Sequence, residues 1–275
     1  MKRRRITTIL LVILLIIGFG MVAYPWVSNG LFASSQAYII EDYRDAVETM
    51  DTEEIEEAKE EALEYDRTEI SSGTGDPFTE ADANIDSGNY ANILNVGDVM
   101  GYLDIPKLHV TLPIYHGTGE LAMREGVGHM EGTSMPVGGS STHCVLASHS
   151  GLTDAKLFTD LDKMKIGDKF YLTVLDEKLT YQVDQINVVL PNDTSKLQVK
   201  QGEDYVTLLT CTPTGMNTHR LLVRGMRIPN EEEEVVAQKP ISDLTILGII
   251  WWMLPLMAAG LILFCVCYCR KRHKR

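Results

Sequence analysis

The 275-residue sequence predicts a mostly β domain, a small barrel or a sandwich, flanked by two transmembrane helices. Two apolar runs of 22 and 26 residues, each without a charge, lie near the two ends of the chain. The segment between them contains seven short strand-like stretches separated by Gly, Pro and Asn or Asp turns. Many short strands with few helices are typical of small barrels and sandwiches.

The first apolar run, residues 6–27, follows the basic sequence KRRR, and the second, residues 244–269, precedes RKRHKR. About 20 apolar residues in a helix cross the hydrocarbon core of a bilayer, so both runs are long enough. A cleaved signal peptide is the alternative for the first run, but its apolar part exceeds the usual length of about 7 to 15 residues. A buried core helix is the alternative for the second run, which its length and basic end disfavour. We expect two spans.

Charge is segregated along the chain. Nine basic and no acidic residues lie in 1–27 and 244–275, which leaves 16 basic and 38 acidic residues, a net charge of −22, between them. Positive residues are retained on the cytoplasmic side of a membrane, so we expect both termini in the cytoplasm and residues 28–243 outside the cell. Nucleic-acid binding is excluded as the function, because the acidic segment repels phosphate.

The extracellular segment begins with a helical pattern. Apolar residues recur at three- and four-residue steps from Ala37 to Met50, and Asp51 and Glu54 have the spacing of a capping box that opens a second helix. The next 29 residues, 67–95, are rich in Gly, Ser, Asp and Asn and lack periodicity. They predict a long loop, of the kind that serves as a lid or a linker.

Strands are expected from residue 96 onward, interrupted by one helix over 153–164, where four apolar residues share a helical face. The expected strands are 99–105, 110–115, 142–148, 169–175, 179–190, 205–211 and 220–228. The expected units are a basic start and first span at 1–27, a helical segment at 28–66, a loop at 67–95, the β domain at 96–229, an acidic linker at 230–243, the second span at 244–269 and a basic tail at 270–275.

Three residues at expected strand ends have the chemistry of a thiol-dependent site. Cys211 ends the stretch YVTLLTC, His149 follows the stretch THCVLAS, and Arg220 stands where the strand after Cys211 returns. Acyl transfer at a peptide bond needs a nucleophile, a proton donor for the leaving amine and a positive group that stabilises the oxyanion. Taken singly, a structural Cys, a functionless His and a surface Arg are the more common interpretations; the combination favours a site.

Cys144 is a weaker candidate for the nucleophile because it lies mid-strand. If His149 and Cys211 meet at the strand ends, Cys144 lies about 16 Å away, at roughly 3.3 Å per residue, and beyond the reach of a disulfide with Cys211. Among the other histidines, His129, His143 and His219 have weaker claims on a site. No His, Cys and carboxylate cluster has ligand spacing, so we expect no metal and no cofactor.

The sequence around these residues resembles the sortases, most closely the class C, pilin-polymerising type of Gram-positive bacteria. The segments 207–225 (TLLTCTPTGMNTHRLLVRG) and 126–168, together with the two-span layout, carry the resemblance. It implies a closed sortase-type β-barrel in the cell membrane of such a bacterium, with the catalytic domain outside. It also implies a cysteine transpeptidase that cleaves an LPXTG-like sorting signal on pilin or surface proteins between Thr and Gly and passes the acyl group to a pilin Lys amine.

On this resemblance Cys211 is the nucleophile, His149 the general acid and then base, and Arg220 the group that stabilises substrate and oxyanion. Class C enzymes also carry a lid with an Asp-Pro-aromatic motif over the active site, and the residues that match it in the loop are Asp76, Pro77 and Phe78. Asp76 would pair with Arg220 while the aromatic ring covers the thiol. An ordinary turn is the alternative on sequence alone.

One position departs from the family pattern. Many class C members have Gly-His-Arg-Gly where this chain has Ser148, His149, Ser150 and Gly151, which leaves the substrate preference open. Two alternative functions also stay open. One is a housekeeping-type sortase, which would use an amine of a peptidoglycan precursor as acceptor, and the other is a non-catalytic membrane scaffold in which Cys211 is structural. The lid motif and the second span favour pilin polymerisation.

Overall fold

The structure is a computed structural model, and it describes residues 2–68, 75–78 and 89–230. Most of the expected loop at 67–95 lies outside these residues, as do nearly all of the acidic linker at 230–243 and the whole of the second span and basic tail at 244–275. The described ranges include the whole of the β domain expected at 96–229.

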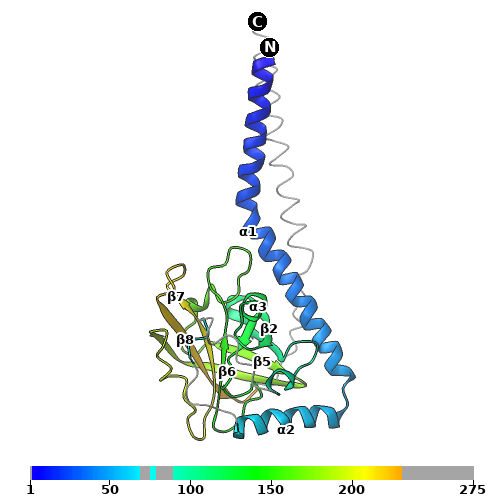
Figure 1. The fold of residues 1–275 in the computed structure, drawn as a ribbon, viewed down its shortest axis with the longest axis vertical. Coiled ribbons are helices and arrows are strands. Elements are labelled where there is room, and N and C mark those ends of the chain that lie inside the picture. The colour runs from blue at the N-terminus through cyan, green and yellow to red at the C-terminus, as the bar shows by residue number, and fades with distance from the viewer. Residues whose placement is uncertain (1, 69–74, 79–88, 231–275) are drawn as a thin grey trace. The chain divides into compact units, whose positions relative to one another are not determined.

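The body of the protein is a closed barrel with the strand order β1-β2-β3-β4-β7-β8-β6-β5 (Figure 1). Its strands are β1 (Gly101–Ile105), β2 (Val110–His116), β3 (Val127–His129), β4 (Thr142–Ala147), β5 (Lys169–Val174), β6 (Glu177–Val189), β7 (Asp204–Thr212) and β8 (His219–Ile228). The prediction of a mostly β fold is confirmed, and it is the barrel that forms. Each of the seven expected stretches overlaps a strand.

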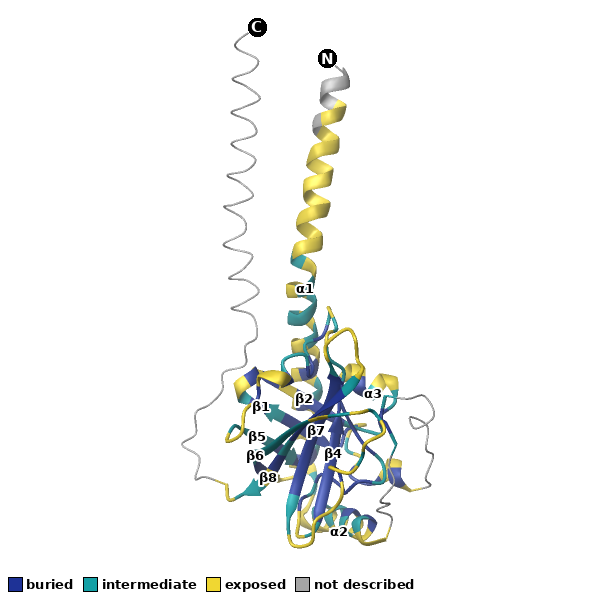
Figure 2. Ribbon diagram, turned by 90° about the vertical axis from the view of Figure 1, so that its left-hand side faces the viewer, coloured by how far each residue is buried: buried dark blue, intermediate teal, exposed yellow. Residues whose placement is uncertain are grey.

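The two central strands for the site are β4 and β7, which pair in parallel, and β7 pairs antiparallel with β8. Both β4 and β7 are buried along almost their whole length (Figure 2). This burial on both faces explains their continuous apolar sequences, since a strand covered on both sides shows no polar alternation.

Two short elements, β3 and the helix α3 (Glu120–Glu125), lie outside the predicted set. β3 has three residues and forms a parallel pair with β2 and an antiparallel pair with β4. Three residues are too few to show the alternation by which a strand is recognised. α3 has six residues, less than two turns, so its sequence carries no helical period either.

The predicted helix over 153–164 is wrong. This segment is a series of turns that ends in a single 3₁₀ turn, η3 (Leu161–Lys163). Leu157 has a φ of 38°, in the left-handed region, and the N–H of Phe158 donates to the carbonyl of His149 at 3.1 Å. The apolar side chains are nevertheless buried in the core. The helical spacing therefore comes from an irregular segment that turns one side toward the core.

The chain begins with two helices, α1 (Lys2–Thr49) and α2 (Thr52–Thr68). The predicted capping box is present, because the N–H of Glu54 donates to the Asp51 carboxylate at 2.9 Å and the N–H of Asp51 to the Glu54 carboxylate at 3.1 Å. α1 runs without interruption through Pro25, so the boundary expected at residue 27 falls inside one helix.

Residues 9–22 of α1 are exposed and predominantly apolar (Figure 2). Among the described residues, α1 contains one stretch, Ile9–Thr49, that is long and apolar enough to cross a membrane, and its most apolar part is not covered by the protein. The C-terminal half packs on the barrel instead. There Tyr43 is buried, and its hydroxyl accepts the N–H of Leu175 at 2.6 Å and donates to the carbonyl of Met100 at 3.3 Å.

The two ends of the expected loop are held side by side on the barrel. Tyr65 of α2 and Tyr90 of the 3₁₀ turn η1 (Tyr90–Asn92) pack with their ring centroids 5.8 Å apart. The hydroxyl of Tyr65 accepts the N–H of Gly132 at 3.1 Å, and that of Tyr90 accepts the N–H of Gly117 at 2.9 Å. The end of α2 and the start of η1 therefore lie beside each other on the barrel.

Candidate active site

Cys211 and Arg220 lie directly opposite each other on β7 and β8. They are partners in the antiparallel register of the two strands, near the end of β7 and at the start of β8. Side chains of directly opposed residues lie on the same face of a sheet, with Cβ atoms about 5 Å apart. The turn between the two strands thus returns the guanidinium beside the thiol, as the sequence spacing indicates.

His149 reaches the same end of the barrel from β4. The parallel pairing of β4 with β7 ends at Ala147 and Leu209, and the N–H of Ser148 adds one further bond to the carbonyl of Leu209 at 3.1 Å. His149 follows directly, two residues past the last pair, as Cys211 does on β7. Because paired parallel strands run in the same direction, His149 and Cys211 lie at the same end of the barrel.

The lid motif lies on these residues. The carboxylate of Asp76 accepts two hydrogen bonds from Arg220, from Nε at 2.8 Å and from Nη2 at 2.6 Å. Both residues are buried, with 3% of Asp76 and 7% of Arg220 exposed. The ring of Phe78 lies beside Arg220 and His149. Its centroid is 5.0 Å from the guanidinium carbon of Arg220 and 5.8 Å from the centroid of the His149 ring.

This arrangement holds the thiol in its neutral form. Cys211 is only 8% exposed, and burial raises the pKa of its thiol. The positive charge of Arg220 acts to lower this pKa, and the negative charge of Asp76 acts to raise it. Since the carboxylate is bonded directly to the guanidinium, it offsets the one nearby group that favours the thiolate.

Glu120 is a site residue that the sequence does not reveal. Its carboxylate lies 3.2 Å from Nε2 of His149. It is the first residue of α3, whose six residues give no periodic signal, and 29 residues separate it from the histidine. A single exposed Glu in an acidic chain has no feature that marks it beforehand.

Two other histidines are parts of the core. His129 is fully buried, its Nδ1 lies 2.8 Å from the hydroxyl of Tyr90, and burial lowers its pKa to about 4. His143 is also buried, with Nε2 2.7 Å from the hydroxyl of Thr207, and burial lowers its pKa as well. Cys144 is buried opposite Val206 in the middle of β4, and burial raises its pKa.

Cys144 and Cys211 are both free thiols. In the described part of the chain, no group of three or more His, Cys, Asp and Glu residues is arranged to hold a metal ion. The chemistry that the described residues offer at this edge is therefore that of a thiol, an imidazole and a guanidinium, with one carboxylate on the imidazole and another on the guanidinium.

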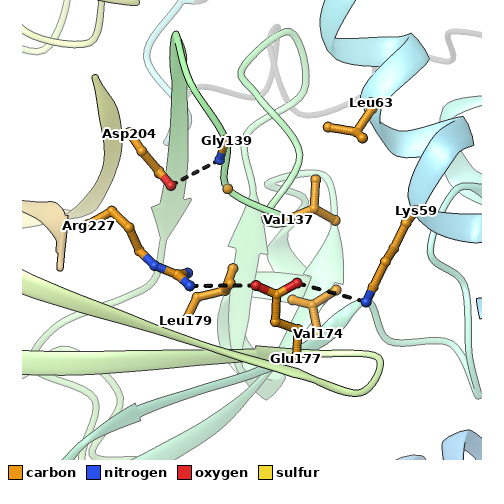
Figure 3. A pocket seen from close by; sticks show the side chains of 10 residues that line it. Lys59, Leu63, Val137, Gly139, Val174, Glu177, Leu179, Asp204 and Arg227 are labelled. Carbon is orange, nitrogen blue, oxygen red and sulfur yellow. Dashed lines mark hydrogen bonds and ion pairs between the residues drawn. The ribbon is translucent and has the colours of Figure 1, made fainter. Parts of the chain in front are cut away.

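A cavity of about 400 Å³ lies between α2 and the barrel, away from this edge (Figure 3). Asp204, at the start of β7, accepts the N–H of Gly139 at 2.9 Å there, and Glu177 lies 3.8 Å from Lys59 and 3.5 Å from Arg227. Asp204 and Cys211 are seven residues apart on one strand, or about 23 Å. The cavity is thus separate from the Cys, His and Arg group.

Comparison with known proteins assigns this fold to a family. Residues 103–228 match the sortase domain. The crystal structure of sortase C-1 from Streptococcus pneumoniae is 45% identical and superposes with a TM-score of 0.67, over 70% of this chain and 98% of that one. The chain belongs to the sortase family. This sortase is also similar to sortase C1 of Streptococcus agalactiae, at 46% identity and a TM-score of 0.66, over 72% of this chain and 97% of that one.

Among curated proteins, sortase A of Streptococcus agalactiae serotype III is 27% identical over 220 residues, which are 79% of this sortase and 82% of the relative. The higher identity to sortases of type C confirms the class C resemblance and the sortase-type barrel. Sortases are cysteine transpeptidases, so the chain is an enzyme, and the scaffold alternative is not supported.

Proposed function

We propose that this sortase cleaves an LPXTG-like sorting signal between Thr and Gly and transfers the acyl group to a Lys amine of a pilin subunit, building covalent pili. The observation that carries the proposal is the buried pair of Asp76 and Arg220, which is joined by two hydrogen bonds and has Phe78 beside it. Two similar structures point the same way. One is a pilus-related sortase C of Group B Streptococcus, 44% identical, and the other, from Streptococcus pneumoniae, 48% identical, bears on pilin substrate specificity.

In the first step, the Cys211 thiol gives its proton to His149, and Sγ attacks the carbonyl carbon of the Thr. The oxyanion that forms lies beside Arg220, whose positive N–H donors stabilise it. The C–N bond then breaks, His149 gives the proton to the leaving Gly amine, and the Thr acyl group remains on sulfur as a thioester. Arg220 can serve in this way because the register places it opposite the nucleophile.

In the second step, the Lys amine attacks the thioester carbonyl, and His149 accepts a proton from the amine. The C–S bond breaks, the thiol is restored, and an isopeptide bond joins the two pilin chains. The carboxylate of Glu120, 3.2 Å from Nε2 of the imidazole, orients the ring through both proton transfers.

The Arg220 guanidinium cannot donate hydrogen bonds to a substrate carbonyl while its N–H groups are bonded to the Asp76 carboxylate. A charge-assisted, bidentate Arg–carboxylate pair is among the stronger hydrogen-bonded contacts in proteins, and here it is shielded from water. A sorting signal must therefore displace the lid motif before its carbonyl can approach Arg220. In this interpretation the described structure is the closed, resting state of the enzyme.

We place the enzyme in the cell membrane of a Gram-positive bacterium, with the barrel outside. The exposed apolar part of α1 supports an N-terminal anchor, and the basic residues at both ends of the chain support two cytoplasmic termini. The acceptor and the sorting-signal proteins are then other proteins of the cell surface.

The test uses the full chain in detergent micelles, as wild type, Cys211→Ala and Cys144→Ala. Each is mixed with an LPXTG-type peptide and a Lys-bearing pilin domain, and adducts are identified by mass spectrometry. Wild type and Cys144→Ala are expected to form the thioacyl enzyme and the isopeptide product, and Cys211→Ala neither. Resolution of the adduct only by water or by a peptidoglycan-type amine would replace pilin polymerisation with wall anchoring. An adduct on Cys211→Ala would overturn the assignment of the nucleophile.

A further inference from the structure

The end of β4 is bonded to β7 beyond the last pair of the sheet. After Ala147 and Leu209 the backbone ladder stops. The N–H of Ser148 still reaches the carbonyl of Leu209 at 3.1 Å, and the hydroxyl of Thr210 then donates to the carbonyl of Ser148 at 2.7 Å. The Thr210 side chain thus extends the hydrogen bonding between β4 and β7 beyond the backbone pairs, and it fixes the position of Ser148, which precedes His149.

Ser150 continues this connection to the proposed nucleophile itself. Its hydroxyl donates to the backbone carbonyl of Cys211 at 2.9 Å. On its other edge Cys211 pairs with Arg220 of β8, so the nucleophile is held from both sides. His149 stands between two serines that are each bonded to β7.

The same segment is also tied to α3. The buried hydroxyl of Ser148 lies 3.1 Å from the carbonyl oxygen of Met123 and 2.6 Å from that of Gly126. These residues lie at the end of the short helix whose first residue, Glu120, contacts His149. Residues 148–150 and α3 are therefore hydrogen-bonded to each other, and together they position the imidazole. Among the described residues, the hydroxyl of Ser150 makes the only side-chain hydrogen bond from this group to the backbone of Cys211.

We propose that Ser150 is a positioning residue for transpeptidation, whose hydroxyl fixes the separation of the His149 imidazole and the Cys211 thiol. The inference rests on the proposed function, in which a proton passes between these two groups. Proton transfer requires that the groups lie within hydrogen-bond reach, and small displacements of reacting groups lower the rate steeply. In this chain the short hydroxyl side chain of Ser150 makes the link.

The experiment uses the full chain in detergent with the change Asp76→Ala throughout, so that release of the lid motif does not limit the rate. Ser150→Ala removes the hydroxyl, and Ser150→Thr keeps it. Thr159→Val is the matched control, because the Thr159 hydroxyl accepts the N–H of Gly151 at 2.9 Å in the same segment without touching Cys211. The rate of thioacyl enzyme formation is followed by mass spectrometry against the concentration of an LPXTG-type peptide.

Ser150→Ala is expected to lower the maximal rate about tenfold, the effect of one lost hydrogen bond expressed in the transition state. The half-saturating peptide concentration should not change, since the hydroxyl is bonded to the Cys211 carbonyl. Ser150→Thr and Thr159→Val should stay within about twofold of the parent. A variant that is merely destabilised would not be rescued by Thr in this way.

Equal maximal rates for Ser150→Ala and the parent would overturn the positioning role. So would an equal loss in Thr159→Val, because general order of the segment would then explain the effect. If Ser150→Ala loses its cooperative unfolding transition, Ser150→Val replaces it, since Val has the shape of Thr without the hydroxyl. Absence of any adduct in the parent is a different result: it overturns the proposed function, on which the inference rests.

Discussion

The carboxylate of Asp76 is bonded to the guanidinium of Arg220 by two hydrogen bonds, although 144 residues separate them in the chain. The pair lies beside Cys211, and the charge of Asp76 offsets part of the lowering that Arg220 exerts on the pKa of the thiol. The contact has two effects: it ties the lid motif to the site, and it disfavours the reactive thiolate. Breaking the contact should reverse both effects.

Asp76→Ala should raise the rate at which iodoacetamide labels Cys211 by about tenfold, because loss of a buried charge-assisted pair is worth more than about 1 kcal/mol. Hydrolytic turnover of a sorting-signal peptide should rise with it. Mass spectrometry of the labelled full chain measures the first effect. Asp184→Ala is the matched control, since Asp184 forms a similar bidentate pair with Arg224, between β6 and β8. Unchanged labelling of Cys211 would refute the lid.

The pH dependence of labelling gives a second test of the same pair. Burial and Asp76 raise the pKa of Cys211, so labelling of the wild type should reach half of its maximum at a higher pH than labelling of an ordinary thiol. In Asp76→Ala one of these causes is gone and no carboxylate opposes the effect of Arg220, so the pH midpoint of labelling should fall. A midpoint that stays in place would mean that the carboxylate does not control the thiolate.

Phe78→Ala should also raise labelling of Cys211, by several-fold, because the ring packs on Arg220 and next to His149. Phe78→Trp keeps an aromatic face and should restore the slow rate. The comparison separates shielding by the ring from the charge effect of Asp76, since neither variant changes a charge. Equal rates in Phe78→Ala and wild type would leave the ion pair as the sole restraint on the thiol.

Arg220→Lys should not behave as a conservative change. Lys retains the charge but lacks the planar fork that bonds both oxygens of Asp76 and that faces an oxyanion. The rate of thioacyl enzyme formation should fall by about 10² to 10³, the cost of removing one oxyanion donor. Cys211 should still be labelled by iodoacetamide, which needs no oxyanion stabilisation. Arg224→Lys, which alters the other bidentate Arg–Asp pair, is the control and should retain activity.

Seven of the eight strands were open to prediction because each of them is a largely apolar run bounded by turn residues. The same logic failed at 153–164, where helical spacing of buried residues arises from turns and from a left-handed Leu157. The pairing of Cys211 with Arg220 follows from a strand, a turn and a returning strand, which is local. The contact of Asp76 with Arg220 is not local, and only the family resemblance indicated it. Glu120 had neither source of information.

Because Asp66 of α2 is buried, we expect the free energy of unfolding to depend on pH for a reason unrelated to catalysis. Its Oδ1 accepts the N–H of Met135 at 2.7 Å, while Oδ2 is buried and has no hydrogen-bond partner among the described residues. Burial raises its pKa from 3.8 to about 7. The folded protein therefore binds more protons than the unfolded chain between about pH 4 and 7, and the free energy of unfolding must fall as pH rises through that window.

Asp66→Asn keeps the acceptor for Met135 and removes the charge. The variant should be more stable than wild type at pH 8, by at most about 4 kcal/mol at about 1.4 kcal/mol per pKa unit, and the difference should shrink as pH falls toward 5. Thermal unfolding of the full chain in detergent, followed by circular dichroism at several pH values, measures this difference. Glu64→Gln, on the same helix, should change stability little at any pH, because Glu64 is exposed. A difference between wild type and Asp66→Asn that is constant from pH 5 to 8 would show that Asp66 is already ionised in the folded protein.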